Sequence, residues 1–381
     1  MSEEWEYRPV SEIADHRLGK MLDKRKNKGD FRQYIRNVNV RWFSFDLSDL
    51  KEMRFTDDEC EKYEIEKGDL VVCEGGYPGR AAIWQDEETI FFQKALHRIR
   101  FHEQERNEWF LYYLFYLDSS GRLKSYFTGA GIQHFTGQTL AKLNVPLPPL
   151  AEQRRIVSIL DEAFGAIAKA KENVEKNLAN AKELFESYLN KVFTEKGAGW
   201  EETTVGDQMT LQRGFDITKK QQKPGNVPVV SSGGIKSHHD TSKVSAPCVV
   251  LGRKGSVGSV YYVEEDFWPH DTTLWVKDFK GNSELLAYYM FRGLDLKTLD
   301  SGAANPALNR NNVHPIEIFW PMHGVDQSVI GSRLQSLERE VEVLDALYQQ
   351  KLTDLDELKQ SILQKAFTGR LTSKSPELES I

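Results

Sequence analysis

Two long stretches of the chain repeat an apolar residue every three or four positions, which predicts long helices that pack along a seam. Roughly 40 residues at about 1.5 Å per residue give each helix a length of about 60 Å. We expect the two helices to pair antiparallel, because a whole globular segment connects them; two separate amphipathic helices, each on its own domain, are the alternative. The first series is Ile156, Leu160, Ala163, Ile167, Val174, Leu178, Ala181, Phe185, Tyr188 and Val192, and the second is Ile330, Leu334, Leu337, Val341, Leu344, Tyr348, Leu355, Leu358 and Ile362.

Short apolar runs precede each helical stretch. Asp69–Cys73, Val227–Val230 and Cys248–Leu251 are rich in β-branched residues, which predicts strands. A proline-containing segment then ends each strand-rich region, at Val145–Leu150 and at Ile318–Met322. The pattern therefore predicts an α+β protein in which globular parts alternate with long helices.

The chain is an internal repeat. Leu184–Thr194 reappears as Leu358–Thr368, with six of eleven positions identical. Further matches keep the same order at similar offsets. Trp5, Glu6 and Val10 match Trp200, Glu201 and Val205, and Gly76 and Gly79 match Gly255 and Gly258. Thr128–Ala130 matches Ser301–Ala303, and Pro148 matches Pro321. We therefore expect a pseudo-two-fold molecule with these parts: globular domains over 1–149 and 197–323, a central helix over 150–196, a C-terminal helix over 324–370 and a flexible tail over 371–381.

Composition is that of an ordinary globular protein, with 40% apolar and 28% charged residues. No run of 18 apolar residues occurs, so we expect no membrane span. The cysteines are Cys60, Cys73 and Cys248, without CxxC spacing, which supports neither a disulfide framework nor a zinc site. A reducing cytoplasm is the simplest location.

The net charge of −7 argues against a nucleic-acid partner when taken alone. However, residues 16–41 hold nine lysines and arginines against Asp23 and Asp30. Such a patch can contact phosphates, and a solvated surface loop explains it equally well.

Motifs of catalysis are missing from the sequence. Gly252–Gly258 is rich in glycine but lacks the ending of a phosphate-binding loop, so we expect a tight hairpin that brings backbone close to a polyanion, or a plain turn. Asn305–Leu308 departs from the motif of amino-methyltransferases, and His238–Asp240 has no second cluster with which to hold a metal ion. We therefore expect neither catalytic residues nor a metal site, and the repeat points to a binding device.

The segment Phe135–Ile156, which contains Pro-Leu-Ala-Glu-Gln-Arg-Arg, resembles the sequence that leads into the central helix of specificity subunits of type I restriction–modification systems. Gly252–Gly258 followed by Phe267–Trp275 is similar to a pattern in their target-recognition domains, and Lys365–Leu371 resembles their C-terminal repeat. The resemblance covers essentially the whole chain. The second copy departs at Pro321–Gln327, where it keeps only the proline and the glutamine, so we expect a weaker start of the second helix.

The resemblance implies a non-catalytic subunit of a multi-subunit adenine methyltransferase and endonuclease. Each globular domain would be a target-recognition domain that reads one half of a bipartite, asymmetric site on double-stranded DNA. The two helices would fix the spacing of the half-sites and bind two methyltransferase subunits, which use S-adenosylmethionine. Restriction subunits, which are motor–nucleases, would add cleavage that depends on ATP and Mg²⁺, and none of these cofactors would bind this chain.

Base readout favours Arg or Lys for guanine and Asn or Gln for adenine. The candidates in the first copy are Arg36, Asn37, Arg41, Tyr77, Arg80, Gln93 and Lys94, and those in the second are Ser231, Ser232, Lys236, Arg253, Lys254, Ser256, His270, Asp271 and Thr272. Candidate phosphate contacts are Lys24, Arg25, Lys26, Lys219 and Lys220. Candidate methyltransferase contacts, for which helix capping and coiled-coil packing are the alternative roles, are Leu150, Glu152, Gln153, Arg154, Arg155 and Gln327.

Two other functions compete with this interpretation. A single-chain methyltransferase or nuclease of a related system would need catalytic motifs that the sequence does not show. A coiled-coil scaffold that binds only proteins would have no use for two divergent domains with glycine hairpins.

Overall fold

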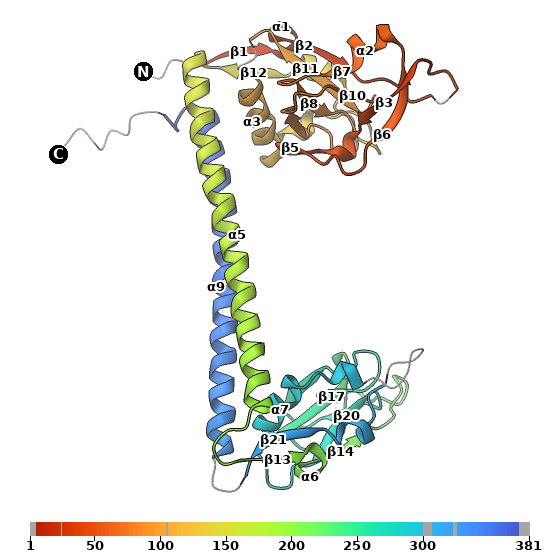
Figure 1. The fold of residues 1–381 in the computed structure, drawn as a ribbon, viewed down its shortest axis with the longest axis vertical. Coiled ribbons are helices and arrows are strands. Elements are labelled where there is room, and N and C mark those ends of the chain that lie inside the picture. Colours follow the sequence, from red (N-terminus) through yellow and green to blue (C-terminus); the bar gives the residue numbers. More distant parts are fainter. Residues whose placement is uncertain (1–4, 24, 104–105, 300–306, 323–325, 373–381) are drawn as a thin grey trace, which may run out of the picture. The chain divides into compact units, whose positions relative to one another are not determined.

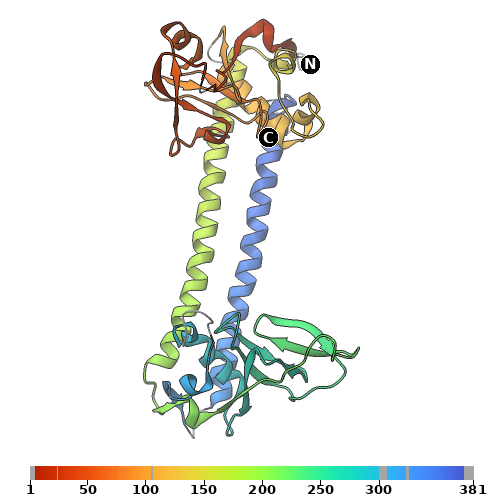
Figure 2. The same ribbon diagram turned by 90° about the vertical axis from the view of Figure 1, so that its right-hand side faces the viewer.

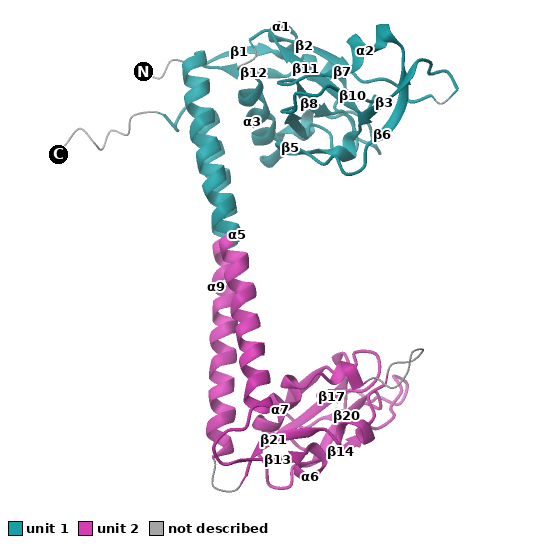
Figure 3. Ribbon diagram, viewed as in Figure 1, with its two compact units in different colours: residues 1–172, 352–381 teal, residues 173–351 magenta. Residues whose placement is uncertain are grey.

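The computed structural model describes residues 5–23, 25–103, 106–299, 307–322 and 326–372. The chain divides into two compact units, shown in different colours in Figure 3: unit 1 comprises residues 1–172 and 352–381, and unit 2 comprises residues 173–351. The two long helices are α5, Leu150–Thr194, and α9, Gln327–Phe367, and each is divided between the units. Each unit is thus a globular part together with a segment of both helices.

Two four-stranded sheets form the globular part of unit 1 (Figure 1), with the orders β2–β11–β8–β9 and β6–β3–β10–β7, and β1–β12 and β4–β5 are small pairs. The strands are β1 Glu6–Pro9, β2 Ala14–Leu18, β3 Asp30–Ile35, β4 Val40–Arg41, β5 Ser44–Phe45, β6 Lys51–Phe55, β7 Glu64–Ile65, β8 Leu70–Cys73, β9 Ala81–Ile83, β10 Ile90–Phe92, β11 Leu96–Phe101 and β12 Asn144–Leu147. The short helices are α1 Val10–Ile13, η1 Asn37–Asn39, α2 Asp57–Tyr63, α3 Arg106–Ser119, η2 Arg122–Tyr126 and α4 Gly137–Ala141.

Unit 2 repeats this plan in shorter form. Its sheets have the orders β14–β20–β17–β18 and β16–β15–β19, and β13 pairs with β21 as β1 pairs with β12. The strands are β13 Trp200–Thr204, β14 Thr210–Arg213, β15 Val227–Ser231, β16 Gly234–His239, β17 Cys248–Gly252, β18 Val260–Val263, β19 Trp268–Pro269, β20 Thr273–Asp278 and β21 Glu317–Pro321. The short helices are α6 Val205–Gln208, α7 Glu284–Gly293, η3 Leu296–Leu299 and α8 Arg310–Val313. The α+β class, the internal repeat and the three predicted strands, now β8, β15 and β17, are confirmed.

Prolines and glutamines start both long helices in the same way. The side-chain amide of Gln153 donates to the carbonyl oxygen of Pro148 at 2.7 Å, and that of Gln327 donates to Pro321 at 2.9 Å. The second helix has an additional cap, because Asp326 Oδ1 accepts from the hydroxyl of Ser328 and from its backbone N–H at 2.9 Å. The hydroxyl bond, followed by the backbone bonds, lowers the pKa of Asp326. The departure of the second copy from the family sequence is therefore met by a different capping residue.

Within each unit the two helices lie side by side and run antiparallel (Figure 2). In unit 1, Lys171 of α5 pairs with Asp356 of α9 at 2.6 Å, and in unit 2, Lys182 pairs with Asp345 at 2.9 Å. Apolar side chains of both helices join the core of each globular part. The predicted antiparallel pairing is therefore confirmed in both units.

The end of each long helix completes the core of the globular part that belongs to the other repeat. Leu363, Ala366 and Phe367, at the end of α9, belong to the core of unit 1. Leu189 and Phe193, at the end of α5, belong to the core of unit 2. Each repeat therefore sends its helix out of its own unit, and the last turns finish the other unit.

Part of the predicted apolar seam is wrong, because the helix ends pack against the globular cores. Tyr188 is 38% exposed and Leu358 is 48% exposed, although both belong to the predicted series, whereas Leu189 and Leu363 are fully buried. Leu344, at 38%, is a third exposed member. Near each helix end the buried position is one residue beyond the predicted one, at Leu189 and Leu363, because the buried face turns there from the partner helix toward a globular core. Leu344 lies in the middle of α9, and this turn does not account for its exposure.

A tyrosine ties each globular part to its own long helix. The hydroxyl of Tyr112 in α3 donates to Asp161 in α5 at 2.6 Å, and that of Tyr289 in α7 donates to Glu338 in α9 at 2.7 Å. Burial, and then the acceptor carboxylate, raises the pKa of both phenols, so each remains a hydrogen-bond donor. The two tethers occupy equivalent positions, since tyrosine and acceptor are the same distance apart along the chain in both copies.

We predict that Phe367→Ala destabilises unit 1 by about 3 kcal/mol or more, because the ring fills the core and a cavity remains. The ring is 6% exposed, stacks on Tyr116 at a centroid distance of 5.0 Å and contacts Trp109 at 4.7 Å. Native-state hydrogen exchange of the α3 amides measures the local free energy of unfolding.

Leu184→Ala is the matched control, because Leu184 lies on α5 and is 71% exposed. We expect it to change the free energy of unfolding by less than about 0.5 kcal/mol. Equal effects of the two substitutions would contradict the completion of unit 1 by the end of α9.

Candidate nucleic-acid interface

Three segments of unit 1 meet at one edge of its sheets. Strands β3 and β10 are parallel, with Tyr34 opposite Phe91, so both carboxyl ends open onto the same edge, where the turn between β8 and β9 also lies. The amide of Asn37 donates to the carbonyl oxygen of Gly75 at 3.1 Å, and Arg80 donates to that of Asn37 at 2.9 Å. We call this surface edge 1; it consists of Arg36–Asn37, Glu74–Arg80 and Gln93–Lys94.

Edge 1 contains an exposed aromatic ring beside a cation. The Arg80 guanidinium lies 4.1 Å from the ring centroid of Tyr77, and Tyr77 is 65% exposed. Arg36 is held by Asp49 at 2.7 Å, and Lys51 and Arg36 together lower the pKa of that carboxyl. Tyr77 and Arg80 thus offer stacking and charge to a ligand, whereas Arg36 is already paired within the protein.

Unit 2 builds an equivalent surface. Strands β15 and β19 are parallel, with Val230 opposite Pro269, and the turn between β17 and β18 lies beside their carboxyl ends. The backbone N–H of Arg253 donates to Thr272 O at 2.8 Å, and that of Ser232 donates to Thr272 Oγ1 at 3.2 Å. We call this surface edge 2; it consists of Ser231–Ser232, Gly252–Ser259 and His270–Thr272.

The side chains of edge 2 differ in their exposure and in their hydrogen bonds within the protein. Lys254 and Ser256 are exposed, and Arg253 is half-buried and donates to the carbonyl oxygen of Asp271 at 3.1 Å. The carboxylate of Asp271 is paired with Arg213 at 2.9 Å. A Cβ on Gly233 would lie 3.1 Å from Lys236 Cε and 3.9 Å from Ser256 Oγ, so these two side chains reach the same point.

The two edges share one backbone and differ in side chains. The backbone N–H of Gly79 donates to Cys73 O at 2.8 Å, and that of Gly258 donates to Gly252 O at 3.0 Å. In the same way Gln93 donates to Ile35 O at 3.3 Å and His270 to Val230 O at 2.8 Å. The repeat places Asn37, Tyr77 and Gln93 of edge 1 where edge 2 has Ser232, Ser256 and His270. The two edges therefore present different polar groups on backbone that is held by equivalent hydrogen bonds.

Glycines permit the turns at both edges. Gly76 and Gly255 have φ values of +79° and +81°, which favour glycine. A Cβ on Gly76 would lie 2.0 Å from the amide nitrogen of Asn37. The predicted hairpin at Gly252–Gly258 is confirmed, since β17 and β18 pair antiparallel on either side of it.

A fourth segment at each edge was missed by sequence reasoning. In unit 1, Gly75 forms a bridge with His134, and the backbone N–H of Phe135 donates to Glu74 O at 2.7 Å. In unit 2, Lys254 pairs in the same way with Ala307. The match of Thr128–Ala130 with Ser301–Ala303 was the available signal, and residues 301–303 lie outside the described part of the chain.

The predicted phosphate contacts lie on two loops outside the residues that define the edges. Arg25 and Lys26 are exposed on the loop between β2 and β3, where Asp23 Oδ1 accepts from their backbone N–H groups at 3.0 and 3.1 Å. Lys24 lies outside the described residues. Lys219 and Lys220 are exposed between β14 and β15. Arg41, on β4, pairs with Asp46 at 3.1 Å.

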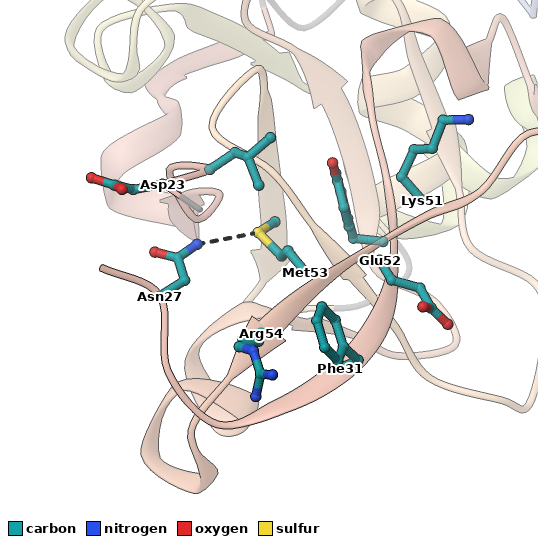
Figure 4. A pocket seen from close by; sticks show the side chains of 9 residues that line it. Asp23, Asn27, Phe31, Lys51, Glu52, Met53 and Arg54 are labelled. Atoms are coloured by element: carbon teal, nitrogen blue, oxygen red, sulfur yellow. Dashed lines mark hydrogen bonds between the residues drawn. The ribbon is translucent and has the colours of Figure 1, made fainter. Parts of the chain in front are cut away.

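A cavity of about 560 Å³ adjoins the loop between β2 and β3 (Figure 4). Asn27 points toward the sulfur of Met53, with an N–S distance of 3.8 Å, and Phe31 carries Arg54 at 4.3 Å from its ring centroid. The lining residues are Leu22, Asp23, Asn27, Phe31, Tyr34, Lys51, Glu52, Met53 and Arg54, and none of them belongs to edge 1.

The predicted partner contacts surround the start of the long helices. Arg154 and Arg155 are exposed, Leu150 and Glu152 are half-buried, and Glu152 accepts a hydrogen bond from Thr372. The Gln153 side chain is 1% exposed. Gln327 is half-buried and also accepts from the backbone N–H of Ser283 at 2.8 Å. Both glutamines hold local structure, so a partner would meet mainly their exposed neighbours.

Burial raises the pKa of Cys73 and of Cys248 to about 12, so both remain thiols. Among the described residues there is no group of three or more His, Cys, Asp or Glu side chains placed to hold a metal ion. Over the same part of the chain, none of the helices has the length and apolar character needed to cross a membrane.

Comparison with known proteins identifies one family. The family described as "Type I restriction modification DNA specificity domain" matches residues 2–176 and again residues 197–350. A putative type I specificity subunit of Haemophilus influenzae is 32% identical over 103 residues, which is 27% of this chain and 26% of the relative. The StySPI specificity subunit of Salmonella potsdam is 22% identical over 66% of this chain and 63% of the relative. The alignments thus span less than two thirds of either relative.

Two solved structures share the fold. A chain from a study of complex assembly and conformational transition of the type I R-M system superposes with a TM-score of 0.78 over 97% of this chain and 99% of that chain, at 17% identity. The HsdS subunit of Thermoanaerobacter tengcongensis gives a TM-score of 0.65 over 97% of this chain and 98% of that chain, also at 17% identity.

One prediction concerns His97, which supports the fourth segment of edge 1. Its side chain is fully buried, and its Nε2–H donates to the carbonyl oxygen of Phe135 at 3.0 Å. Burial lowers the pKa of His97 to about 4, against 6.5 ordinarily, so the folded state binds fewer protons than the unfolded state between these values. Stability is therefore full above pH 6.5 and falls as the pH drops toward 4, with a loss of about 2 kcal/mol at pH 5.

We expect His97→Gln, which retains a donor for Phe135, to flatten this pH dependence. The measurement is the free energy of unfolding of unit 1 at pH 7 and pH 5. His238→Gln, at an exposed histidine, is the control and should keep the wild-type slope. A slope that is the same in wild type and His97→Gln would contradict the prediction.

Proposed function

The chain belongs to the type I restriction modification DNA specificity domain family, and we propose that it is a non-catalytic subunit that reads a bipartite, asymmetric site on double-stranded DNA. The observation that carries the proposal is the pair of edges, which share backbone geometry but not side chains. Each unit reads one half of the site with its own edge. The two halves differ in sequence because the edges differ in donors and acceptors.

The chemistry of each edge supports a role in base readout. At edge 1, Arg80 and Gln93 are types that read guanine and adenine, and Tyr77 offers an exposed ring. At edge 2, the exposed Lys254 and the half-buried Arg253 stand on a glycine turn that lets backbone approach a polyanion closely. The lysines and Arg25 on the loops that follow β2 and β14 position the chain on phosphates without specifying sequence.

Two methyltransferase subunits are the proposed protein partners. The internal repeat offers two similar surfaces to two identical partners. Exposed apolar side chains on the long helices support protein docking, since Leu184 is 71% exposed and Val343 and Leu347 are each 60% exposed. S-adenosylmethionine would be held by those partners for adenine methylation, and restriction subunits using ATP and Mg²⁺ would add cleavage. The assembly would act in the cytoplasm, where the three thiols stay reduced.

The paired helices act as a ruler for the spacing of half-sites. Both helices continue without a break from one unit into the other, which supports this role. Each residue of helix advances the chain by about 1.5 Å and each base pair advances DNA by about 3.4 Å.

The first test of DNA reading removes the two cations at the turn of edge 2. We predict that Arg253→Ala with Lys254→Ala weakens binding to the preferred duplex by about tenfold or more and lowers the salt dependence of binding. Dissociation constants are measured for the chain alone and with its methyltransferase partner, on duplexes selected from a random library.

Lys277→Ala is the control, because Lys277 is exposed on β20 and lies outside edge 2. It should bind as wild type does. If no duplex is bound even with the partner present, the chain is a protein-binding scaffold and the proposal is wrong. Methylation by the purified chain alone would instead reveal an enzyme.

The second test shortens the ruler. Deleting Glu175–Ala181 and Ala346–Leu352 removes one heptad from each helix, between the ion-paired residues. We expect the preferred spacer to shorten by about three base pairs while both half-sites stay the same. Selection from a duplex library reads out both quantities, and an unchanged spacer would exclude the ruler.

A further inference from the structure

The internal repeat poses a pairing problem that the apolar seam does not solve. Leu189 and Phe193 at the end of α5 correspond in the repeat to Leu363 and Phe367 at the end of α9. All four side chains are buried in a globular core. Because the two helix ends present nearly the same apolar residues, packing alone would allow α5 to pair with the α5 of a second copy, or α9 with a second α9.

Charges along the seam distinguish these pairings. Lys171 pairs with Asp356 in unit 1 at 2.6 Å, and Lys182 pairs with Asp345 in unit 2 at 2.9 Å. The alignment that matches Leu184–Thr194 with Leu358–Thr368 also matches Lys171 with Asp345 and Lys182 with Asp356. The two ion pairs are therefore copies of one contact, and in both copies the lysine lies on α5 and the aspartate on α9.

We propose that these four residues form a charge code that restricts α5 to pairing with α9 and excludes pairing of either helix with a second copy of itself. In a pair of two α5 helices, Lys171 of each would face Lys182 of the other. In a pair of two α9 helices, Asp345 of each would face Asp356 of the other. Only α5 with α9 places opposite charges together at both positions.

A second contact, between each globular part and a long helix, also joins unlike residues from the two repeats. In both units the second repeat supplies a cation and the first repeat supplies an aromatic ring. In unit 1, the ammonium of Lys359 on α9 lies 4.9 Å from the ring centroid of Phe115 on α3. In unit 2, the guanidinium of Arg292 on α7 lies 5.5 Å from the ring centroid of Phe185 on α5. In the repeat, Phe115 corresponds to Arg292 and Phe185 corresponds to Lys359, so ring and cation have exchanged places.

This exchange adds an obstacle to self-pairing of the second repeat. Lys359 also lies 4.4 Å from the ring centroid of Phe164, which corresponds in the repeat to Glu338. In a dimer of two second repeats, Arg292 and Lys359 of the other copy would therefore meet as two cations that share the single carboxylate of Glu338. Arg292 also bonds Glu186 of α5 at 3.0 Å and Glu338 of α9, and the residue corresponding to Glu186 is the neutral Gln360. In a dimer of two first repeats, Phe115 would meet Phe185, which is not repulsive. Self-pairing is therefore excluded more strongly for the second repeat than for the first.

The code pairs the helix of one repeat with the helix of the other, so that an assembly of two halves contains one first half and one second half and thus two different edges. It concerns how the chain pairs and does not depend on the proposed DNA function. A loss of discrimination would let the helix of each repeat pair with the same helix of a second copy, so that two first halves or two second halves combine.

The test uses the folded full-length chain, cleaved at a protease site inserted in the linker at Gly197–Gly199. Cleaved light and isotopically heavy preparations are mixed, and native mass spectrometry counts the pairs. The first half is the fragment before the cleavage site and the second half is the fragment after it. Pairs that join a light first half to a heavy second half, or the reverse, prove that the halves have exchanged between molecules. We expect such first-with-second pairs to exceed self-pairs by about tenfold or more in wild type.

The decisive variant is Lys182→Asp with Asp345→Lys. This variant keeps an ion pair between α5 and α9 in both units. Each helix now carries one positive and one negative residue, so a pair of two α5 helices, or of two α9 helices, would also place opposite charges at both contacts. We expect self-pairs of the first half to rise toward the statistical mixture, and self-pairs of the second half to rise less because of Arg292 and Lys359. The matched control adds Lys171→Asp and Asp356→Lys, which exchanges the code completely and should restore wild-type discrimination.

Two results would overturn the proposal. One is a statistical mixture already in wild type, and the other is a double variant that discriminates as wild type does. Lys176→Asp, an exposed position of α5 outside both ion pairs, checks that a charge reversal elsewhere on the helix leaves the distribution unchanged.

Discussion

The antiparallel pairing of α5 with α9 is the interaction on which the rest of the structure depends. The helices do more than connect two domains, because the end of each one fills the core of a globular part. Phe367 lies among Trp109, Tyr113 and Tyr116 in unit 1, and Phe193 lies beside Trp200 and Trp320 in unit 2. Neither unit has a complete core without a segment from each helix, so helix pairing and domain folding are coupled.

This coupling leaves the edges free to diverge. The turns and strand ends that form edges 1 and 2 are held by backbone hydrogen bonds that recur in both copies, and their side chains carry little of the core. Asn37 and Ser232, or Gln93 and His270, can therefore differ without loss of the fold. A scaffold that fixes backbone while tolerating change at loop tips is suited to acquiring new targets.

Sequence predicted the features that repeat. The long helices, the glycine turns at Gly76 and Gly255 and the membership in the family all followed from spacing and motifs. The slip of the seam at Tyr188 did not, because heptad counting cannot tell when the buried face turns from a helix toward a globular core. Neither did the role of His134 at edge 1, since that contact joins residues far apart in sequence. The relation of Lys171 to Asp345 was visible in the repeat, but it acquired meaning only when the structure showed which residues face each other.

The measurement that tests the central claim most directly is mapping of adenine methylation by long-read sequencing. Cells that express the methyltransferase subunit of a type I system are compared under three conditions. They also express the wild-type chain, no chain, or a chain in which the side chains of edge 1 replace those of edge 2. The account predicts a bipartite motif that requires the chain, and a change confined to one half of that motif when edge 2 is altered. A motif that persists without the chain, or an edge exchange that alters both halves together, would contradict the claim that one reading unit is written twice and used independently.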